Sequence, residues 1–337
     1  MTERTGLASA FLESAGWGTA AKTPLAGDAS ARRYFRLKRG DLAAVLMDAP
    51  ADRGEDIAPF VRMARWLRGA GFSAPDILAE DADRGFLLLE DLGDDLFASL
   101  MAEDPSREVP LYSAAADFLT DLHRHQPPGW LVPYDPRTLG EMVRITSEWY
   151  LPALGADPSA AEDLPALVRD AGERLLSDTS VVCLRDFHAE NLIWLPEREG
   201  TARVGLLDFQ DAFAGHPAYD LVSLLQDARR DVPRPVEAMI VARFLDANGY
   251  EHERFSAAYA LLGAQRNLRI LGVFARLALS AGKPQYLRLI PRVWGYVRRN
   301  LAHPELAALA RLVGESFPDP EPKTLRKIAE RCLPPFP

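Results

Sequence analysis

Residues Val181–Asp220 carry the most informative pattern in the chain and read VVCLRDFHAENLIWLPEREGTARVGLLDFQDAFAGHPAYD. Two apolar runs within it have the length and composition of short buried strands. The first is followed by Asp186 and then Asn191, and the second ends directly before Asp208. Carboxylates beside buried strands are costly unless they are paired or bind a metal. The pattern favours phosphoryl transfer, in which one Asp orients the acceptor hydroxyl while an Asn and a second Asp hold magnesium on nucleotide phosphates.

The length and charge of the chain narrow the class of protein. With 337 residues it exceeds the usual size of a single core, so we expect two lobes. The net charge of −9, without a basic run, disfavours nucleic acid and anionic membrane surfaces as partners. The N-terminus lacks the pattern of a secretory signal, and no apolar stretch is long enough to cross a bilayer. These features are typical of a cytoplasmic enzyme.

The first part of the chain is predicted to form a small antiparallel sheet with one main helix. After a short helix over 5–15, the strands are expected at Tyr34–Leu37, Leu42–Met47, Ile77–Ala79 and Gly85–Leu89, and the main helix at Asp56–Ala70. The polar segment that follows, ending in Gly93, has the character of a hinge. The sequence therefore predicts an N-terminal lobe over 1–92 and a second lobe over 93–337.

The second lobe is predicted to be mostly helical, with the Val181–Asp220 stretch as a strand-and-loop insertion. The helices are expected at Leu96–Ala102, Leu111–His123, Leu139–Leu151, Ala160–Leu176, Asp220–Ala228, Pro235–Asn248, His252–Ala281, Tyr286–Asn300, Pro304–Glu315 and Lys323–Arg331. We interpret the charged residues of Ala160–Leu176 and His252–Ala281 as solvated helix faces. The fold class is thus α+β, with the bilobal arrangement of protein kinases.

A turn of small residues, Gly27–Ser30, precedes the strand that contains Tyr34. Such a turn can cover phosphates through its backbone N–H groups. The alternative is an ordinary hairpin turn, because no G-x-G-x-x-G pattern is present.

Three motifs carry a family resemblance, namely 185–191 (RDFHAEN), 207–211 (LDFQD) and 215–221. With them the chain resembles the aminoglycoside phosphotransferase and choline kinase superfamily, which shares the protein-kinase fold. Within that superfamily it is most similar to bacterial kinases that phosphorylate the anomeric hydroxyl of N-acetylmuramate and N-acetylglucosamine in cell-wall recycling. The segments 28–36 and 45–50 contribute to this closer likeness.

The resemblance implies a role for each matching residue. Asp186 is expected to be the catalytic aspartate, and Asn191 and Asp208 to hold Mg²⁺ on the phosphates of ATP. The segment Glu90–Leu92 is expected to meet the adenine edge, and Asp220 to brace the loop that carries Asp186. The residues expected to bind nucleotide are Ser30, Arg33, Arg36, Glu90, Asp91 and Leu92.

One departure from the family pattern concerns the lysine expected on the third strand of the first lobe. That strand reads AAVLMD over 43–48 and contains no Lys. A different cation must then neutralise phosphate charge, and the candidates are Arg32, Arg33 and Arg36 on the preceding strand. Strand alternation puts Arg33 on the face opposite to the other two.

Four further residues near the motifs are candidate substrate contacts: His188, Glu190, Gln210 and Asp211. Each also has a structural interpretation, because His188 can pack inside the loop and the acids can be solvent-exposed.

These observations predict an ATP- and Mg²⁺-dependent kinase that phosphorylates a hydroxyl of a small molecule, with an amino sugar as the expected acceptor. An aminoglycoside, a choline-like amine or another metabolite is the alternative acceptor. A catalytically inactive, kinase-like binding protein is a third reading. The missing lysine favours it, whereas the presence of Asp186, Asn191 and Asp208 argues against it.

Overall fold

The computed structural model describes residues 2–25, 31–176 and 180–332. Its contacts divide the chain into two compact units. Unit 1 consists of Met1–Arg107 and Ala189–Ala212, and unit 2 of Glu108–His188 and Phe213–Pro337. Relative to the expected boundary after Leu92, unit 1 continues to Arg107 and also takes in a segment from the second half of the chain.

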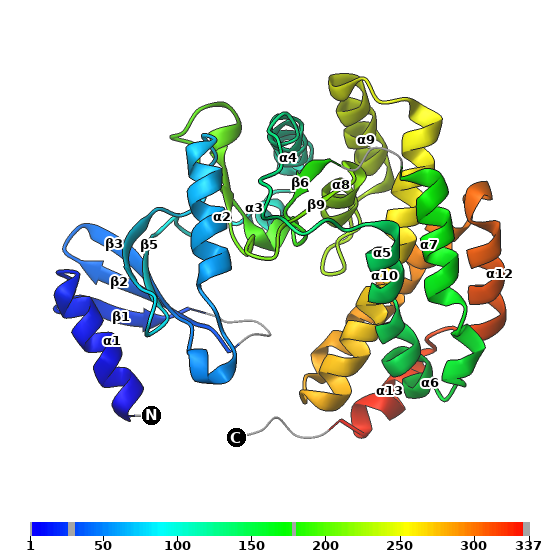
Figure 1. Ribbon diagram of the computed structural model, residues 1–337, viewed down its shortest axis with the longest axis horizontal. Coiled ribbons are helices and arrows are strands. Elements are labelled where there is room, and N and C mark those ends of the chain that lie inside the picture. The colour runs from blue at the N-terminus through cyan, green and yellow to red at the C-terminus, as the bar shows by residue number, and fades with distance from the viewer. Residues whose placement is uncertain (1, 26–30, 177–179, 333–337) are drawn as a thin grey trace. The chain divides into compact units, whose positions relative to one another are not determined.

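Unit 1 is built on a five-stranded antiparallel sheet (Figure 1). In spatial order its strands are β1 (Ala21–Pro24), β2 (Arg33–Arg39), β3 (Leu42–Asp48), β5 (Phe86–Glu90) and β4 (Ile77–Asp81). The tight turn at Gly40, where φ is +59°, joins β2 and β3. The predicted antiparallel sheet is confirmed.

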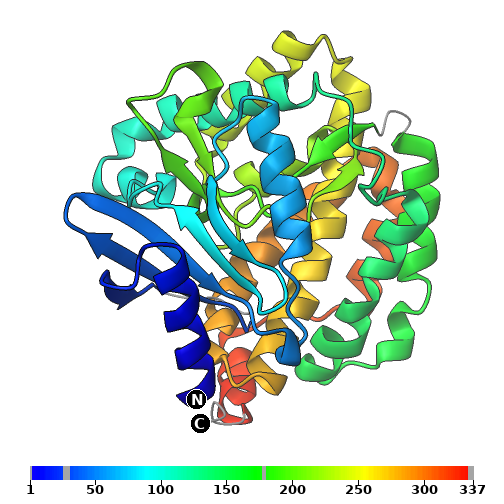
Figure 2. The ribbon, with the colours of Figure 1, turned by 60° about the vertical axis from the view of Figure 1, so that its left-hand side comes forward.

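The two helices α1 (Thr2–Ser14) and α2 (Ala58–Gly69) lie on opposite sides of this sheet (Figure 2). Leu46 and Leu88 are register partners and share a buried cluster with Phe11 of α1. Their chain neighbours point to the other side, because side chains alternate along a strand. Burial of each large side chain in such a layer stabilises the fold by about 1.5–3 kcal/mol.

A second, smaller hairpin completes unit 1. It consists of β7 (Leu192–Trp194) and β8 (Val204–Leu206). Backbone bridges join Gly205 to Ser73 and Ile193 to Leu96, which precedes α3 (Phe97–Glu103). These bridges explain why the segment from Ala189 to Ala212 belongs to unit 1.

Unit 2 is helical, apart from the antiparallel pair β6 (Val181–Cys183) and β9 (Phe213–Gly215). Its helices are α4 (Glu108–Leu122), α5 (Pro136–Met142), α6 (Leu151–Leu154), α7 (Leu164–Leu175), α8 (Ala218–Leu225), α9 (Arg234–Asn248), α10 (His252–Ser280), α11 (Ile290–Leu301), α12 (Ala307–Ser316) and α13 (Pro322–Glu330). α10 is the long central helix, and it contacts α7, α8 and α11. The prediction that the second lobe is mostly helical is confirmed.

The single helix predicted over Leu139–Leu151 is wrong. The chain instead forms α5, a π-helical turn at Thr146–Tyr150 and then α6. Two backbones approach closely at this point: a Cβ on Gly272 of α10 would lie 2.5 Å from the carbonyl carbon of Ile145. The Thr146 hydroxyl also donates to the carbonyl of Leu268 at 2.7 Å, which fixes the irregular turn against α10.

Within the described residues, no helix combines the length and apolar character required to cross a membrane.

Candidate active site

The loop that carries Asp186 follows β6 in unit 2, and hydrogen bonds to Asp220 of α8 hold it in place. The carboxylate of Asp220 accepts hydrogen bonds from the backbone N–H groups of Leu184, at 2.5 Å, and Arg185, at 2.9 Å. Asp220 is completely buried, and burial raises the pKa of its carboxyl group to about 7 although both N–H groups oppose that rise. The predicted bracing role of Asp220 is confirmed.

The same loop contains a strained residue. Arg185 has a φ of +73°, a conformation that costs a non-glycine residue roughly 1–2 kcal/mol. Its carbonyl accepts a hydrogen bond from the Ser223 hydroxyl at 3.2 Å, and Ser223 in turn accepts one from the Arg266 guanidinium at 2.5 Å. Contacts from α8 and α10 therefore offset the strain and fix the position of Asp186.

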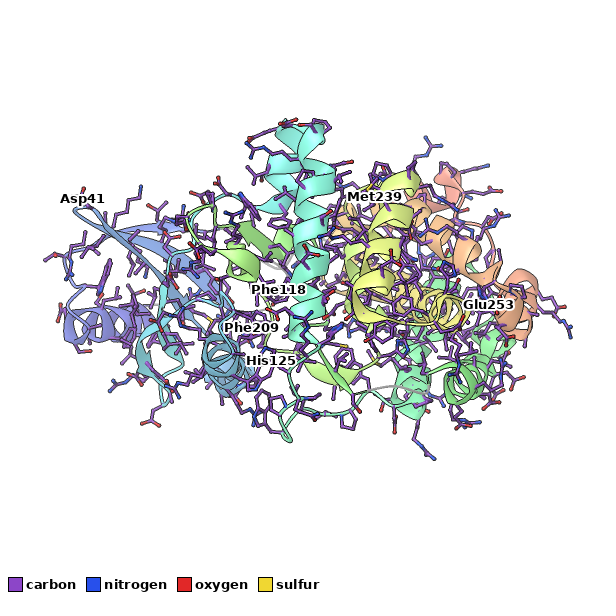
Figure 3. The ribbon with its side chains drawn as sticks, turned by 90° about the horizontal axis from the view of Figure 1, so that it is seen from above. Asp41, Phe118, His125, Phe209, Met239 and Glu253 are labelled. Carbon is purple, nitrogen blue, oxygen red and sulfur yellow. The ribbon has the colours of Figure 1, made fainter. Side chains whose placement is uncertain are left out.

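An aromatic stack anchors the far side of this loop. Phe187 lies directly after Asp186 and stacks on Phe118 of α4 with ring centroids 5.5 Å apart. Phe118 is labelled in Figure 3. Both rings are buried, so the loop cannot shift without opening this core contact.

Asp186 lies in a strongly positive environment. Its carboxylate oxygen Oδ1 is 3.9 Å from Nη2 of Arg266, and 32% of its side chain is exposed. Burial opposes ionisation of Asp186, but the charges of Arg266 and Arg185 outweigh it and lower the pKa of the carboxyl group. Asp186 is therefore a carboxylate at neutral pH, able to accept a hydrogen bond or a proton from a hydroxyl group.

The expectation that the charged residues of the His252–Ala281 helix face solvent is wrong for Arg266. This residue is only 6% exposed and lies among the buried residues of α10. The sequence signal was available: apolar residues recur on all sides of this helix rather than on one stripe, which is typical of a buried helix.

The pair Asn191 and Asp208 lies in unit 1, at one end of the β7–β8 hairpin. The register pairs Leu192 with Leu206, and the N–H of Leu207 donates to the carbonyl of Asn191 at 2.9 Å. Asn191 takes part in this last contact and Asp208 directly follows it, so both residues lie at the same end of the hairpin. Asp208 has a φ of +55°, and its carboxylate accepts a hydrogen bond from the Gln210 amide at 2.6 Å.

This pair fits a magnesium ion better than it fits a transition metal. Among the residues that the structure describes, no group of three or more His, Cys, Asp or Glu side chains is arranged to hold a metal. Mg²⁺ does not need such a group, because it takes one or two protein oxygen ligands and completes its shell with water and phosphate. One amide oxygen and one exposed carboxylate are suited to that mode of binding.

The side chains of the expected nucleotide-binding residues near the end of β5 contact other residues of unit 1. Glu90 forms ion pairs with Arg198 at 2.5 Å and Arg68 at 3.4 Å. Asp91 accepts a hydrogen bond from the N–H of Gly93 at 3.1 Å. Leu92 is buried in a cluster with Ile193 and Leu195. Ser30 lies outside the described residues.

Each of the three arginines considered as phosphate-neutralising cations is paired with a carboxylate. The pairs are Arg32 with Glu55 at 2.7 Å, Arg33 with Asp48 at 2.6 Å, and Arg36 with Asp91 and Asp94, both at 2.7 Å.

The three arginines point to different faces of the sheet. Arg33 is the register partner of Asp48, which also binds Arg4 of α1, so this pair lies on the α1 side. Tyr34 and Arg36 share the other face of β2, and Arg32, which directly precedes the strand, interacts with Tyr34. Burial raises the pKa of Tyr34, and the charge of Asp208 raises it further. The face with Tyr34 and Arg36 is therefore the one nearer to Asp208.

The four candidate substrate contacts differ in exposure. His188 is buried, its Nε2 atom lies 3.4 Å from the Arg229 guanidinium, and burial lowers its pKa to about 4, so the ring is neutral at pH 7. Glu190 and Asp211 are exposed, and Gln210 is half-buried beside Asp208.

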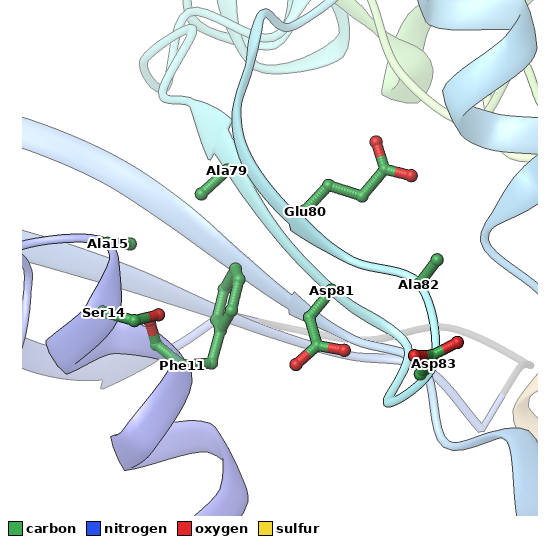
Figure 4. Close-up of a pocket in the computed structure, with 8 residues that line it drawn as sticks. All are labelled: Phe11, Ser14, Ala15, Ala79, Glu80, Asp81, Ala82 and Asp83. Carbon is green, nitrogen blue, oxygen red and sulfur yellow. The ribbon is translucent and has the colours of Figure 1, made fainter.

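A separate hollow in unit 1 lies between α1 and the end of β4 (Figure 4). Its lining residues are Phe11, Ser14, Ala15, Ala79, Glu80, Asp81, Ala82 and Asp83. None of the expected site residues lines it.

Comparison with known proteins places the chain in a family. Residues 22–259 match the family described as the phosphotransferase enzyme family. An N-acetylmuramate/N-acetylglucosamine kinase from Caulobacter vibrioides is 41% identical over an alignment that covers 91% of this chain and 95% of the relative. A protein of the same name from Pseudomonas aeruginosa is 36% identical, with coverages of 88% and 90%.

Solved structures show the same fold at low sequence identity. A GDP complex of a mutant aminoglycoside 2'-phosphotransferase-IIIa has a TM-score of 0.62 at 14% identity, and covers 89% of this chain and 97% of its own. A choline/ethanolamine kinase family protein from Mesorhizobium loti has a TM-score of 0.60 at 18% identity, with coverages of 97% and 99%. The fold is thus the kinase-like one, and the chain belongs to the phosphotransferase enzyme family.

Proposed function

We propose that this phosphotransferase moves the γ-phosphoryl group of ATP to the anomeric hydroxyl of an amino sugar, with N-acetylmuramate and N-acetylglucosamine as acceptors. The observation that carries this proposal is the 41% identity to the Caulobacter vibrioides kinase across 91% of the chain. A cytoplasmic location, where ATP is available, is part of the proposal.

In this reaction Asp186 is the residue that meets the acceptor. Its ionised carboxylate accepts a hydrogen bond from the sugar hydroxyl and so orients the attacking oxygen. The new bond forms between that oxygen and the γ-phosphorus, while the bond from the γ-phosphorus to the bridging oxygen of ADP breaks. The hydroxyl proton passes to the Asp186 carboxylate late in the step, and ADP leaves. The low pKa of Asp186, set by Arg266 and Arg185 against burial, keeps the carboxylate available for this role.

Asn191 and Asp208 are the residues proposed to hold Mg²⁺. Bound there, the ion would neutralise charge on the β- and γ-phosphates of the nucleotide. The β7–β8 register supports this assignment, because it puts an amide and a carboxylate at one end of one hairpin.

For the cation that replaces the missing lysine, we propose Arg32 and Arg36 and leave out Arg33. Arg36 lies on the face of β2 that is nearer to Asp208, and Arg32 interacts with Tyr34 of that face. Arg33, in contrast, is paired with Asp48 on the α1 side. A nucleotide phosphate would compete with Glu55, Asp91 and Asp94 for these guanidinium groups.

The experiment that tests the proposal measures ATP consumption with N-acetylmuramate, N-acetylglucosamine, an aminoglycoside and choline as acceptors. We expect turnover with the two amino sugars, and a loss of kcat on the order of 10²–10⁴ in Asp186→Asn. Turnover with only the aminoglycoside or only choline would overturn the assignment of the acceptor. If wild-type protein consumes no ATP with any acceptor but is stabilised by an ATP analogue with Mg²⁺, the chain is a binding protein.

A further inference from the structure

A cluster of arginines surrounds Asp186 in unit 2. Arg185 precedes it in the loop, and Arg266 and Arg269 lie three residues apart on α10, hence on the same side of that helix. The charges of all three lower the pKa of the Asp186 carboxyl group, against the effect of its burial. Three guanidinium groups therefore act on one carboxylate.

Hydrogen bonds within the protein hold two of these arginines in position. The guanidinium of Arg266 donates to Ser223 and lies 3.9 Å from Asp186, with 8% of its side chain exposed. Arg185 is held through its backbone by Asp220 and Ser223. Arg266 thus has a side-chain role in holding the loop, and the position of Arg185 is fixed by its backbone.

Arg269 differs from them. Its side chain is partly exposed, and within residues 2–25, 31–176 and 180–332 its guanidinium forms neither a hydrogen bond nor an ion pair. Burial lowers the pKa of Arg269, and the charges of Arg185 and Arg266 lower it too. A partly buried guanidinium beside two others is unfavourable unless an anion compensates it.

Tyr219 is a second residue of this region whose polar group lacks a partner among the described residues. It is buried, and in the described part of the chain its hydroxyl has no hydrogen-bond partner. Tyr219 directly precedes Asp220, whose carboxylate holds the loop that carries Asp186. Burial raises the pKa of Tyr219, and the charges of Arg266 and Arg269 lower it. A buried hydroxyl without a partner usually indicates an absent ligand or water.

The carboxylates near the cluster are engaged with groups other than Arg269. Asp186 lies 3.9 Å from Arg266, and the oxygens of the buried Asp220 accept hydrogen bonds from the backbone N–H groups of Leu184 and Arg185. Arg269 itself has no carboxylate partner in the described part of the chain. The planar fork of a guanidinium matches the two oxygens of a carboxylate or phosphate. An anionic group on a ligand would therefore complete this site.

We propose that Arg269 binds a carboxylate on the acceptor and makes the enzyme prefer an anionic amino sugar to a neutral one. This inference rests on the proposed function. N-acetylmuramate carries a carboxylate on its lactyl ether, whereas N-acetylglucosamine has none. Arg269 lies about one helical turn from Arg266, whose guanidinium is 3.9 Å from Asp186, so a sugar whose hydroxyl meets Asp186 is within reach of Arg269.

The test compares kcat/KM for both sugars in wild-type protein and Arg269→Gln. We expect kcat/KM for N-acetylmuramate to fall about 10- to 100-fold, the range for loss of a charged hydrogen bond, and that for N-acetylglucosamine to stay within about threefold. Arg269→Lys keeps the charge without the fork and should lie between. Arg276→Gln, an exposed arginine farther along α10, is the matched control and should match wild type.

Two results would overturn the inference while leaving the proposed function intact. An equal loss on both sugars in Arg269→Gln and in Arg269→Lys would mean that Arg269 serves the transferred phosphoryl group or the fold. Unchanged kinetics on both sugars would mean that it binds neither. If wild-type protein phosphorylates neither sugar, the proposed function fails and the inference falls with it.

Discussion

Each unit contains one cluster of arginines that bears on the proposed reaction, and the two clusters differ in their carboxylate partners. In unit 1, Arg32, Arg33 and Arg36 are each paired with at least one carboxylate. In unit 2, Arg185, Arg266 and Arg269 act on the carboxylate of Asp186. Carboxylates therefore balance the first cluster more fully than the second.

The difference bears on how each unit would meet a ligand. Phosphate bound by Arg36 must displace Asp91 and Asp94, so binding in unit 1 exchanges one ion pair for another. An anion bound at Arg269 displaces nothing that the structure describes. We infer that unit 1 changes its ion pairs when nucleotide binds, and that unit 2 is preformed for an anionic acceptor.

The largest effect is expected from removing the proposed metal ligand of unit 1. Asp208→Asn should lower kcat on the order of 10³-fold and raise the Mg²⁺ concentration needed for half-maximal rate, because the ion contributes several kcal/mol of charge stabilisation. Steady-state kinetics over a Mg²⁺ titration measures both. Glu197→Gln, an exposed residue of the same hairpin, is the control, and a normal Mg²⁺ dependence in Asp208→Asn would contradict the assignment.

The next effect concerns the brace under Asp186 in unit 2. Asp220→Ala leaves the N–H groups of Leu184 and Arg185 buried without a partner, each at a cost of about 1–3 kcal/mol. We expect a loss of unfolding free energy of about 2–5 kcal/mol. Thermal unfolding compares it with Asp170→Ala, an exposed acid of α7 whose loss should change little. Equal stability of the two variants would show that Asp220 is no brace.

A smaller effect distinguishes the two faces of β2. Arg36→Gln should raise KM for ATP about 10-fold, because a charged hydrogen bond to phosphate is lost. Arg33→Gln should leave KM within about twofold, since its partner Asp48 keeps Arg4. Isothermal titration with an ATP analogue gives an independent value. If Arg33→Gln has the larger effect, the assignment of faces is wrong.

The smallest effect is expected on the pH dependence of stability, through His188 of unit 2. The folded-state pKa of His188 is about 4, lowered from 6.5 mainly by burial. Between these values the unfolded chain binds more protons at this residue, so stability decreases as the pH falls from 6.5 to 4. His188→Gln should remove about 2 kcal/mol of the stability difference between pH 7 and pH 5. Melting curves at both pH values test this, with the exposed His252→Gln expected to behave as wild type.

Sequence patterns could predict the sheet of unit 1, the main helix α2 and the brace at Asp220. Those features depend on strand alternation, on helical spacing and on a motif. The three-residue strands β7 and β9 were not predicted. Like β6 and β8 they are too short to show a period, but β6 and β8 were identified as apolar runs that precede Asp186 and Asp208.

Two parts of the candidate site depend on tertiary structure. Arg266 and Arg269 follow Asp186 by some eighty residues and lie within a helix whose charges the sequence analysis assigned to solvent. The partners of Arg33 and Arg36 are set by sheet register and by which face carries α1. Neither fact is encoded in local spacing. The roles of Asn191 and Asp208 remain predictions, although both residues lie at the same end of the hairpin.

We propose that phosphate is transferred to the anomeric hydroxyl of an amino sugar, and ³¹P NMR of the product formed from ATP and N-acetylmuramate tests this transfer. We predict a sugar 1-phosphate, with phosphorus coupled to the anomeric proton and the reducing end of the sugar lost, in stoichiometric amount with ADP. A phosphate ester at any other hydroxyl, or ADP formed without a sugar phosphate, would refute transfer to the anomeric position.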